Sequence, residues 1–283
     1  MFDLDCLIFP ASSGTAYGCR QLDPPQWQQL AQDPAGLLWR NVDRPVKIAP
    51  ESLIVEADLP LRTGPRRIAY KRYRPRNGWK AFCSLFRTAR ALRSWRLAQV
   101  LASRRIPTPL ALFAYVPHRW RLMEPSYLAT EWIEGGENLH LYGWRLAWYP
   151  NRERAARASR CAESLGRLIG LLHAAQIDHR DLKGANLMVV ERGSDVRTFL
   201  VDLDGVRLRK RLAFRRRAAN LARLAAGLSA HPWVTRSACC RFLRAYAAQF
   251  PSGAVEWKPL WRAVATRSGR LTRRKRRRAE PVL

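Results

Sequence analysis

The sequence predicts an α+β protein with two lobes, a small one rich in antiparallel strands and a larger one that is mostly α-helical. Short strand-like runs separated by turn residues fill residues 37–133, whereas amphipathic helical patterns dominate the chain after residue 136. Between them, Glu134-Gly135-Gly136 breaks both patterns, as a linker does. The 283 residues, 47% of them hydrophobic, suffice for one large core or for two lobes that share a cleft.

The first lobe is expected over residues 36–133, after an N-terminal accessory segment over residues 1–35 in which residues 24–31 can form a short helix. Turns containing proline separate its first four strands, which predicts an antiparallel meander. A long helix is expected over residues 79–104, because the prolines that follow do not continue a helix. Strands are expected at residues 37–39, 46–49, 52–57, 67–73, 110–116 and 127–133.

The second lobe is expected over residues 134–266. A helix over residues 153–175 has an apolar stripe at Leu165, Leu168, Ile169 and Leu172. Two short strands and two further helices follow, and the basic tail over residues 267–283 is expected to be disordered because it is too charged to pack. The strands are predicted at residues 187–190 and 198–201, and the helices at residues 218–228 and 237–249.

The formal net charge of +29 is extreme and unevenly spread. Residues 59–123 contain sixteen Lys or Arg and no acidic residue, and residues 273–278 form an unbroken basic run. Self-repulsion on this scale indicates a polyanionic surface or substrate, and both nucleic acid and anionic lipid fit. The simplest alternative is a protein that is merely basic, with solvated charged faces.

The sequence also indicates the compartment. No apolar run approaches the eighteen or so residues of a membrane span, and the first residues carry acids where a secretory signal carries bases. The six cysteines lack a metal-type Cys-x-x-Cys spacing, so reduced structural thiols are expected. These features predict a cytoplasmic protein.

Residues 179–186, His-Arg-Asp-Leu-Lys-Gly-Ala-Asn, carry the strongest chemical signal in the chain. Phosphoryl transfer needs a carboxylate to orient the attacking hydroxyl, cations on the phosphate and oxygen ligands for Mg²⁺. In this segment Asp181 can orient the hydroxyl, Lys183 can reach the γ-phosphate of ATP, and Asn186 can bind the metal. His179 is interpreted as a structural anchor. The sequence therefore predicts a kinase-type site with ATP and Mg²⁺ as cofactors.

A second metal ligand is expected at the end of a nearby strand. Asp202 directly follows three apolar residues and is the predicted ligand. Asp204 points the same way if the segment stays extended, so it is either a further ligand or a turn residue before Gly205.

Two features of the first lobe fit nucleotide binding. Lys71 ends a predicted strand where a kinase keeps the lysine that holds the α- and β-phosphates. The alternative is that Lys71 is one more solvated charge. Backbone groups at Glu131, Trp132 and Ile133 are expected to hold the adenine edge, with the Glu131 side chain as a marker of this segment rather than a catalyst.

Together these residues resemble the protein-kinase-like fold, and the fuller pattern is similar to the lipopolysaccharide kinase (Kdo/WaaP) family. The resemblance implies transfer of phosphate from ATP to a sugar hydroxyl of the lipopolysaccharide inner core, at the cytoplasmic side of the inner membrane. An anionic glycolipid acceptor and peripheral contact with an anionic membrane suit the basic composition. The resemblance covers roughly residues 36–250 and rests on residues 68–74, 105–109, 130–135, 179–186, 201–207 and 241–246.

The sequence departs from the kinase pattern at several points. The predicted helix over residues 79–104 has no acidic residue to pair with Lys71. Residues 37–57 have no glycine for a loop over the phosphates, and Gly14–Gly18 lies far upstream. Asp204 stands where protein kinases have Gly, and no Ala-Pro-Glu follows, which disfavours a peptide substrate.

Two alternatives remain beside a glycolipid kinase. The first is a kinase of the same fold that acts on a protein or a small molecule. The second is a catalytically degenerate kinase-like module that docks on anionic surfaces, favoured by the missing helix carboxylate and disfavoured by the intact residues 179–186. A role confined to nucleic acid is disfavoured, because no known DNA- or RNA-binding motif is present.

Overall fold

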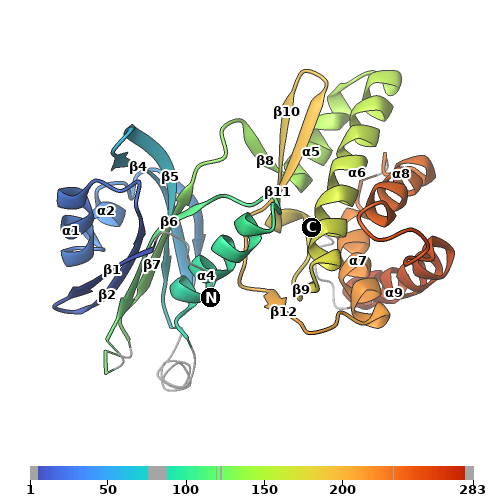
Figure 1. The fold of residues 1–283 in the computed structure, drawn as a ribbon. Helices are drawn as coiled ribbons and strands as arrows, with labels where there is room; N and C mark the ends of the chain where they lie inside the picture. Colours follow the sequence, from blue (N-terminus) through green and yellow to red (C-terminus); the bar gives the residue numbers. More distant parts are fainter. Residues whose placement is uncertain (1–5, 76–87, 119, 122, 232, 278–283) are drawn as a thin grey trace. The chain divides into compact units, whose positions relative to one another are not determined.

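The computed structural model describes residues 6–75, 88–118, 120–121, 123–231 and 233–277 (Figure 1). The chain divides into two compact units. Unit 1 comprises residues 1–103 and 109–133, and unit 2 comprises residues 104–108 and 134–283. Gly135 lies just after the division and has a φ of +68°, a left-handed conformation that glycine adopts without strain.

Unit 1 is built on an antiparallel sheet that has seven strands among the described residues, in the order β1-β2-β6-β7-β5-β4-β3 (Figure 1). The expected strands at residues 46–49, 52–57, 67–73, 110–116 and 127–133 are confirmed as β3 to β7, with shifted ends. The strands are β1 (Cys6–Ala11), β2 (Gly14–Cys19), β3 (Pro45–Ala49), β4 (Ser52–Leu61), β5 (Gly64–Tyr73), β6 (Ala111–Pro117) and β7 (Ser126–Glu131).

The two faces of this sheet pack against different helices, because successive side chains along a strand point to opposite faces. On one face Tyr70 is fully buried in a core that includes Trp27 of α1 (Pro24–Gln32) and Leu38 of α2 (Gly36–Trp39). On the other face Tyr73 donates to Ser94 of α4 (Arg90–Ser103) at 3.4 Å. Lys71 shares the α4 face with Tyr73.

Three expectations for unit 1 change. The described part of the expected accessory segment 1–35, from residue 6 on, belongs to unit 1 itself, because β1 and β2 are strands of the sheet and α1 packs in its core. The apolar residues 37–39 form part of α2 rather than a strand, since a short apolar run does not distinguish the two. The predicted long helix is confirmed over Arg90–Ser103 only, and its residues 79–87 lie outside the described part.

Unit 2 is mostly helical, as expected. The long helix α6 packs against α8, and α7 packs against α9 (Figure 1). The helices are α5 (Leu139–Arg145), the 3-10 turn η1 (Leu146–Trp148), α6 (Asn151–Ala174), the 3-10 turn η2 (Gly184–Asn186), α7 (Phe214–Leu228), α8 (Arg236–Ala247) and α9 (Trp257–Arg277). The strands are β8 (Gly136–Asn138), β9 (Ile177–His179), β10 (Leu187–Arg192), β11 (Asp195–Leu200) and β12 (Val206–Leu208).

The prediction of a disordered tail from residue 267 is wrong as far as Arg277, where α9 ends. The first turns of this helix are anchored, because Leu260 is 1% exposed and α9 packs on α7. An anchored helix propagates readily into residues of good helix propensity, and Arg and Lys are among them. The charge pattern alone therefore overstated the disorder. In the described part of the chain no helix is both long and apolar enough to cross a bilayer.

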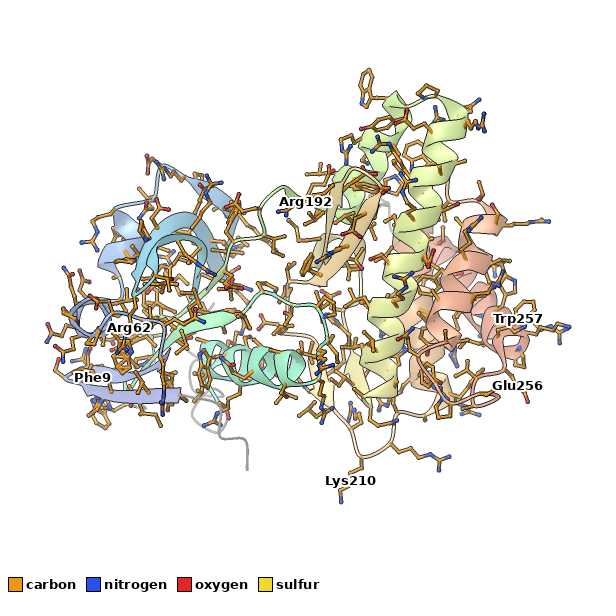
Figure 2. The ribbon with its side chains drawn as sticks, turned by 45° about the horizontal axis from the view of Figure 1, so that its top comes forward. Phe9, Arg62, Arg192, Lys210, Glu256 and Trp257 are labelled. Atoms are coloured by element: carbon orange, nitrogen blue, oxygen red, sulfur yellow. The ribbon has the colours of Figure 1, made fainter. Side chains whose placement is uncertain are left out.

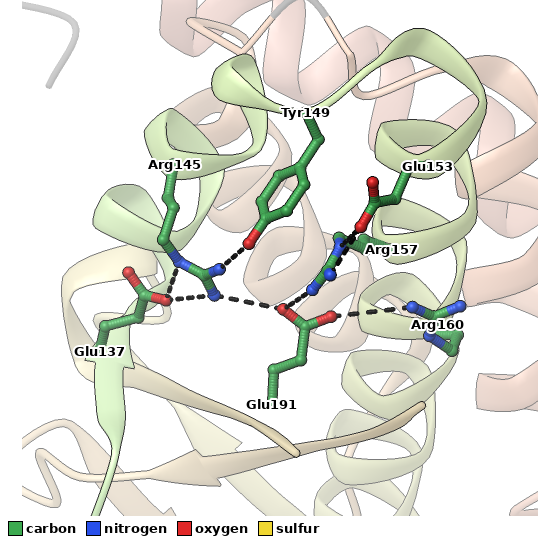
Figure 3. Close-up of polar contacts among 7 residues, drawn as sticks. All are labelled: Glu137, Arg145, Tyr149, Glu153, Arg157, Arg160 and Glu191. Carbon is green, nitrogen blue, oxygen red and sulfur yellow. Dashed lines mark hydrogen bonds and ion pairs between the residues drawn. The ribbon is translucent and has the colours of Figure 1, made fainter. Parts of the chain in front are cut away.

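An ion-pair cluster fixes β10 against α5 and α6 (Figure 3). The Glu191 carboxylate is only 5% exposed and lies 3.2 Å from Arg145, 2.6 Å from Arg157 and 3.8 Å from Arg160. Arg145 also binds Glu137 at 2.6 Å. Because a nearly buried carboxylate needs compensating charge, this cluster holds the outer end of the β10–β11 hairpin on the helices.

Candidate active site

Residues 179–186 connect β9 to β10 and form a loop with a short 3-10 turn at its end. β9 pairs antiparallel with β12, so that Val206 lies opposite His179. The Arg180 amide then donates to the Gly205 carbonyl at 2.9 Å. A side chain at position 205 would meet the Asp181 amide and the His179 ring at 3.0 Å, so glycine permits this close approach. The strand pairing therefore brings the loop beside the segment that contains Asp202 and Asp204.

Three of the predicted site residues meet within the loop. The Lys183 ammonium lies 2.9 Å from Oδ2 of Asp181, and Asn186 donates from Nδ2 to the Asp181 carbonyl at 2.8 Å and to Oδ2 at 3.2 Å. Asn186 is buried, whereas Asp181 and Lys183 are about half exposed. Among the described residues none bonds to Oδ1 of Asp181. This exposed carboxylate is held at one oxygen and can accept a hydroxyl at the other.

His179 links this loop to the segment containing Asp202. The Asp181 amide donates to its Nδ1 at 3.2 Å, and its Nε2 lies 3.0 Å from the Asp202 carbonyl oxygen. Since Nδ1 accepts, the proton of the neutral ring is on Nε2, which donates to Asp202. Burial lowers the pKa of His179 and so favours this neutral form. These contacts support the expected anchoring role.

Asn186 and Asp202, the two predicted metal ligands, flank a pair of adjoining strands, since Asn186 directly precedes β10 and Asp202 follows the end of β11. The Val201 amide donates to the Asn186 carbonyl at 3.1 Å, which places the residue before Asp202 beside Asn186. Within the described chain no group donates to the side-chain oxygen of Asn186, whose Nδ2 is bound to Asp181. An amide oxygen and a carboxylate fit Mg²⁺, which keeps several water and phosphate ligands of its own. Among the described residues, no cluster of three or more His, Cys, Asp or Glu side chains is placed to hold a metal ion.

The backbone at Asp204 forms a tight turn. Its amide donates to Oδ1 of Asp202 at 3.2 Å, and its carbonyl accepts from Arg207 at 3.2 Å. The amide contact is the geometry of an Asx turn, which supports the alternative of a turn residue at position 204.

Asp178, a buried carboxylate that the sequence analysis missed, stabilises the strand that leads into the loop. Asp178 is 1% exposed and accepts from Arg209 at 3.1 Å, Arg216 at 3.4 Å and Asn220 at 3.0 Å. Burial alone would raise the pKa of Asp178, but the bonds from Asn220 and Arg209 outweigh it and lower the pKa. Asn220 also accepts from the His179 amide at 2.8 Å, so α7 holds both Asp178 and His179 of β9.

A chain of buried polar groups extends from Asn220 into the helices. His173 of α6 lies 3.3 Å from the Asn220 side-chain oxygen through Nε2 and 2.9 Å from the Tyr246 hydroxyl of α8 through Nδ1. Burial lowers the pKa of His173 to about 4, so the ring is neutral at pH 7. His173 and Asn220 lie on the apolar faces of α6 and α7, and this could have been noticed in the sequence. Because buried polar groups almost always have partners, such residues indicate a buried hydrogen bond.

In unit 1, Lys71 lies on β5 between Ile54 of β4 and Leu128 of β7. Its ammonium is 4.4 Å from the centre of the Tyr73 ring. No acidic residue occurs in α4; instead Arg90 of this helix binds Glu51, in the turn between β3 and β4, at 2.8 Å. In this ion pair the helix supplies the cation and the turn between the strands supplies the acid. In the pair expected in a kinase, the strand supplies the lysine and the helix supplies the carboxylate. Gly14–Gly18 is part of β2, which three strands separate from β4.

The predicted adenine segment follows the end of β7. The Glu131 amide donates to Leu110 at 2.9 Å, and the Trp132 amide donates to Arg67 at 3.1 Å. The Glu131 side chain accepts from Arg66 at 3.1 Å, which fits a marker rather than a catalyst. The Ile133 amide has no backbone acceptor within the described residues, so this amide is available to a ligand.

Unit 2 also contains an apolar cavity of about 440 Å³ between α5, α6, α7, α8 and α9. Leu165, Leu224, Phe242 and Trp261 are among its lining residues. None of the predicted site residues lines this cavity, so it is separate from the loop at residues 179–186.

Comparisons with known proteins agree with the sequence resemblance. The solved structure of WaaP in complex with acyl carrier protein has a TM-score of 0.61 and 20% identity, and the match covers 90% of this chain and 97% of that chain. At this identity the likeness establishes the fold, which is the two-lobed α+β kinase-like fold. The crystal structure of the BubR1 kinase domain has a TM-score of 0.42 and 12% identity, covering 71% of this chain and 49% of that chain. No curated protein sequence matches.

The family is established by sequence. The model of the lipopolysaccharide kinase (Kdo/WaaP) family matches residues 75–246, which is more than half of the chain and includes the loop at residues 179–186. The predicted resemblance is thereby confirmed, and with it the prediction of a phosphotransferase. The chain is a kinase that belongs to the lipopolysaccharide kinase (Kdo/WaaP) family.

Proposed function

We propose that this protein transfers the γ-phosphate of ATP to a sugar hydroxyl of the lipopolysaccharide inner core, with Mg²⁺ as cofactor. The observation that carries the proposal is the contact of Asp181 with Lys183 and Asn186 in one loop, beside the segment containing Asp202. Family membership supplies the acceptor class, and the net charge of +29 fits an acceptor rich in phosphate and carboxylate groups.

In the proposed reaction the acceptor hydroxyl donates a hydrogen bond to Oδ1 of Asp181. Its oxygen bonds to the γ-phosphorus as the bond between that phosphorus and the bridging oxygen of ADP breaks, and the hydroxyl proton passes to Asp181. Lys183, 2.9 Å from the same carboxylate, is close enough to neutralise charge on the transferring phosphoryl group. Lys71 is proposed to bind the α- and β-phosphates, and the backbone at Glu131, Trp132 and Ile133 the adenine.

Asn186 and Asp202 are proposed to hold Mg²⁺, which when bound neutralises phosphate charge and orients the γ-phosphate. Asn186 is held through its Nδ2, which donates to Asp181, and this leaves its side-chain oxygen for the metal. Asp204 is proposed to shape the turn, because its amide already binds Asp202.

We place the reaction at the inner face of the inner membrane, with peripheral attachment of the protein. An excess of basic residues supports this location, because each base near an anionic surface contributes roughly 1 kcal/mol. The basic helix α9 is one candidate for the contact, since it carries no acidic residue. Binding to vesicles of neutral and anionic lipid measures this attachment, and equal binding to both would contradict it.

An acyl carrier protein is a further candidate partner, because WaaP was solved in complex with one. The apolar cavity of about 440 Å³ in unit 2 favours this proposal, since it offers an apolar chain a dry site. Size-exclusion chromatography of the protein mixed with acylated carrier protein tests the complex. Separate elution at micromolar concentrations would remove this partner.

The acceptor is tested by following labelled γ-phosphate from ATP with Mg²⁺ and a panel of acceptors. We expect label in lipopolysaccharide and in its released core oligosaccharide, and none in protein or small-molecule acceptors. Label in a protein or a small molecule instead would favour a kinase with another substrate. Asp181→Ala is the blank, and label transferred equally by this variant would contradict the assigned site.

A further inference from the structure

The segment that follows the candidate metal ligands is strongly basic. Seven of the eleven residues from 207 to 217 are Lys or Arg, and none is acidic. We call these residues the basic segment. Folding explains only part of the run, because like charges repel and the arginines in the first turn of α7 oppose the dipole of that helix. Residues that break local rules in this way commonly serve a ligand.

The backbone of the basic segment is fixed against β9 and Gln176, which lead into the loop at residues 179–186. Strand β12 pairs with β9, so Arg207 lies opposite Asp178. Further along, the Arg209 amide donates to the Gln176 carbonyl at 3.0 Å, and the Leu212 amide donates to the Gln176 side chain at 2.7 Å. These hydrogen bonds fix the backbone from which the side chains of the segment project.

Part of the basic segment has an internal role. Arg209 and Arg216 compensate the buried Asp178, and Arg217 lies 5.5 Å from the centre of the Phe250 ring. Arg207 donates to the carbonyl groups of Asp204 and Val206. These four arginines hold the segment in place.

The other three basic residues face solvent. Lys210, Arg211 and Arg215 are exposed, and among the described residues no carboxylate lies within ion-pair distance of them. Lys210 points away from the helices of unit 2 (Figure 2). Arg180, next to Asp181, is also exposed. Exposed cations therefore occur both beside Asp181 and at the far end of the segment.

The spacing suits an extended acceptor. Lys210 is five positions after Gly205, which binds the Arg180 amide, and five steps span at most about 17 Å at 3.3 Å per residue. That is the length of several sugar units. Leu208 and Phe214, 49% and 40% exposed, lie in the same segment and offer apolar faces on which sugar rings can pack.

We infer that the basic segment, through Lys210, Arg211 and Arg215, binds phosphate or carboxylate substituents of the acceptor while its hydroxyl reaches Asp181. The inference rests on the proposed function and adds the residues that select an anionic acceptor. We assign the bound anions to the acceptor itself rather than to membrane lipid. The reason is that the basic segment follows closely in the chain after Asp202, which is proposed to bind the metal of the same reaction.

The test compares two variants that each remove three positive charges. K210Q/R211Q/R215Q changes the exposed bases of the basic segment, and R270Q/R273Q/R274Q changes three exposed bases of α9. The acceptor is lipopolysaccharide core oligosaccharide released from its lipid, so that membrane binding does not contribute. For the first variant we expect KM for the oligosaccharide to rise by about tenfold or more, with kcat and KM for ATP within about twofold of the parent. The α9 variant should retain the parent KM.

A second arm removes the anions from the acceptor. Treatment of the oligosaccharide with phosphatase, or reduction of its carboxylates, should raise KM for the parent and abolish the difference between parent and K210Q/R211Q/R215Q. Titration of the acceptor into both proteins on the Asp181→Asn background checks binding without turnover, and the expected difference is again about tenfold.

Two results would overturn the inference while leaving the proposed function intact. One is phosphorylation of the released oligosaccharide with the same KM by the parent and the K210Q/R211Q/R215Q variant. The other is a difference seen only with lipid-embedded acceptor, which would assign the segment to membrane headgroups. If the parent neither binds nor phosphorylates any core oligosaccharide, the proposed acceptor is wrong, and the inference falls with it.

Discussion

Nε2 of His179 donates a hydrogen bond to the backbone carbonyl of Asp202, 3.0 Å away, while Nδ1 of the same ring accepts from the Asp181 amide. One imidazole thus fixes the residue proposed to orient the acceptor relative to the residue proposed to bind metal. Because the ring is buried and burial lowers its pKa, it keeps this neutral form at physiological pH. Both halves of the site therefore depend on one buried side chain.

The metal assignment predicts a difference between two neighbouring carboxylates. Asp202→Ala should remove the increase in ATP affinity that Mg²⁺ produces, which we expect to be at least about tenfold in the parent. Asp204→Ala should largely retain it, because the Asp204 amide, which the variant keeps, makes the contact to Asp202. Titration of a fluorescent ATP analogue with and without Mg²⁺ measures both. Loss of the Mg²⁺ effect in Asp204→Ala alone would exchange the two roles.

Replacing Asp178 should loosen the basic segment. Asp178→Asn removes the charge that compensates Arg209 and Arg216, and we expect a loss of about 2–3 kcal/mol, reduced from the value for a fully buried pair because both arginines are partly exposed. Hydrogen exchange at the Arg209 and Leu212 amides, both of which bind Gln176, should become faster.

The matched control for this change is Asp195→Asn. Asp195 likewise forms an ion pair with an arginine, Arg197, at 2.8 Å, but both side chains of this pair are exposed. An exposed pair contributes about 0–1 kcal/mol, so stability and exchange should stay near the parent. Similar losses for the two variants would mean that burial of Asp178 has no special effect.

The buried His173 predicts a pH dependence of stability. Its pKa is about 4 in the folded protein and 6.5 in a model peptide, so between these values the unfolded state binds a proton that the folded state does not. Stability therefore falls as the pH is lowered through this window. From pH 6.5 to pH 5 the loss from this group is about 2 kcal/mol, at 1.36 kcal/mol per pH unit.

Urea unfolding of the parent and of His173→Gln at pH 7 and pH 5 isolates this contribution. Gln can keep a donor toward Asn220 and an acceptor toward Tyr246 but does not titrate. We expect the variant to lose about 2 kcal/mol less than the parent between the two pH values. An identical pH dependence in both proteins would show that His173 titrates normally.

The ion-pair cluster around Glu191 predicts unequal effects of two Glu→Gln changes. Glu191 is 5% exposed and lies near three arginines, so Glu191→Gln should lower the stability by about 2–4 kcal/mol. Glu153, 45% exposed, binds Arg157 at 2.7 Å, and Glu153→Gln should cost less than about 1 kcal/mol. Urea midpoints followed by circular dichroism measure both. Equal midpoints for the two variants would contradict the role of burial.

The loop at residues 179–186 could be found in the sequence because its chemistry is local, with several residue types at fixed spacing and a strand on each side. The residues that support it could not. Asn220 and Tyr246 reach the loop or His173 from 41 and 73 residues away in sequence, and only the packing of three helices brings them together. A polar residue on an apolar helix face signals a partner without identifying it.

Local patterns also failed at the two ends of the chain. Strands β1 and β2 contain Pro10, Gly14 and Gly18, which normally indicate turns, and the sheet overrides this preference by pairing β2 with β1 and β6. Helix α9 continues to Arg277 because packing of its first half supplies the nucleus for a basic run that would not fold alone. In both cases tertiary contacts decided what local composition could not.

The most direct test of the central claim is the effect of Asp181→Asn on transfer and on nucleotide binding. The claim is that Asp181 orients the acceptor hydroxyl, while Lys183, Asn186 and Asp202 serve the nucleotide and its metal. We predict that transfer of labelled γ-phosphate to core oligosaccharide falls by at least about 1,000-fold, with the Kd for MgATP within about threefold of the parent. Transfer at the parent rate, or loss of MgATP binding together with transfer, would contradict the account.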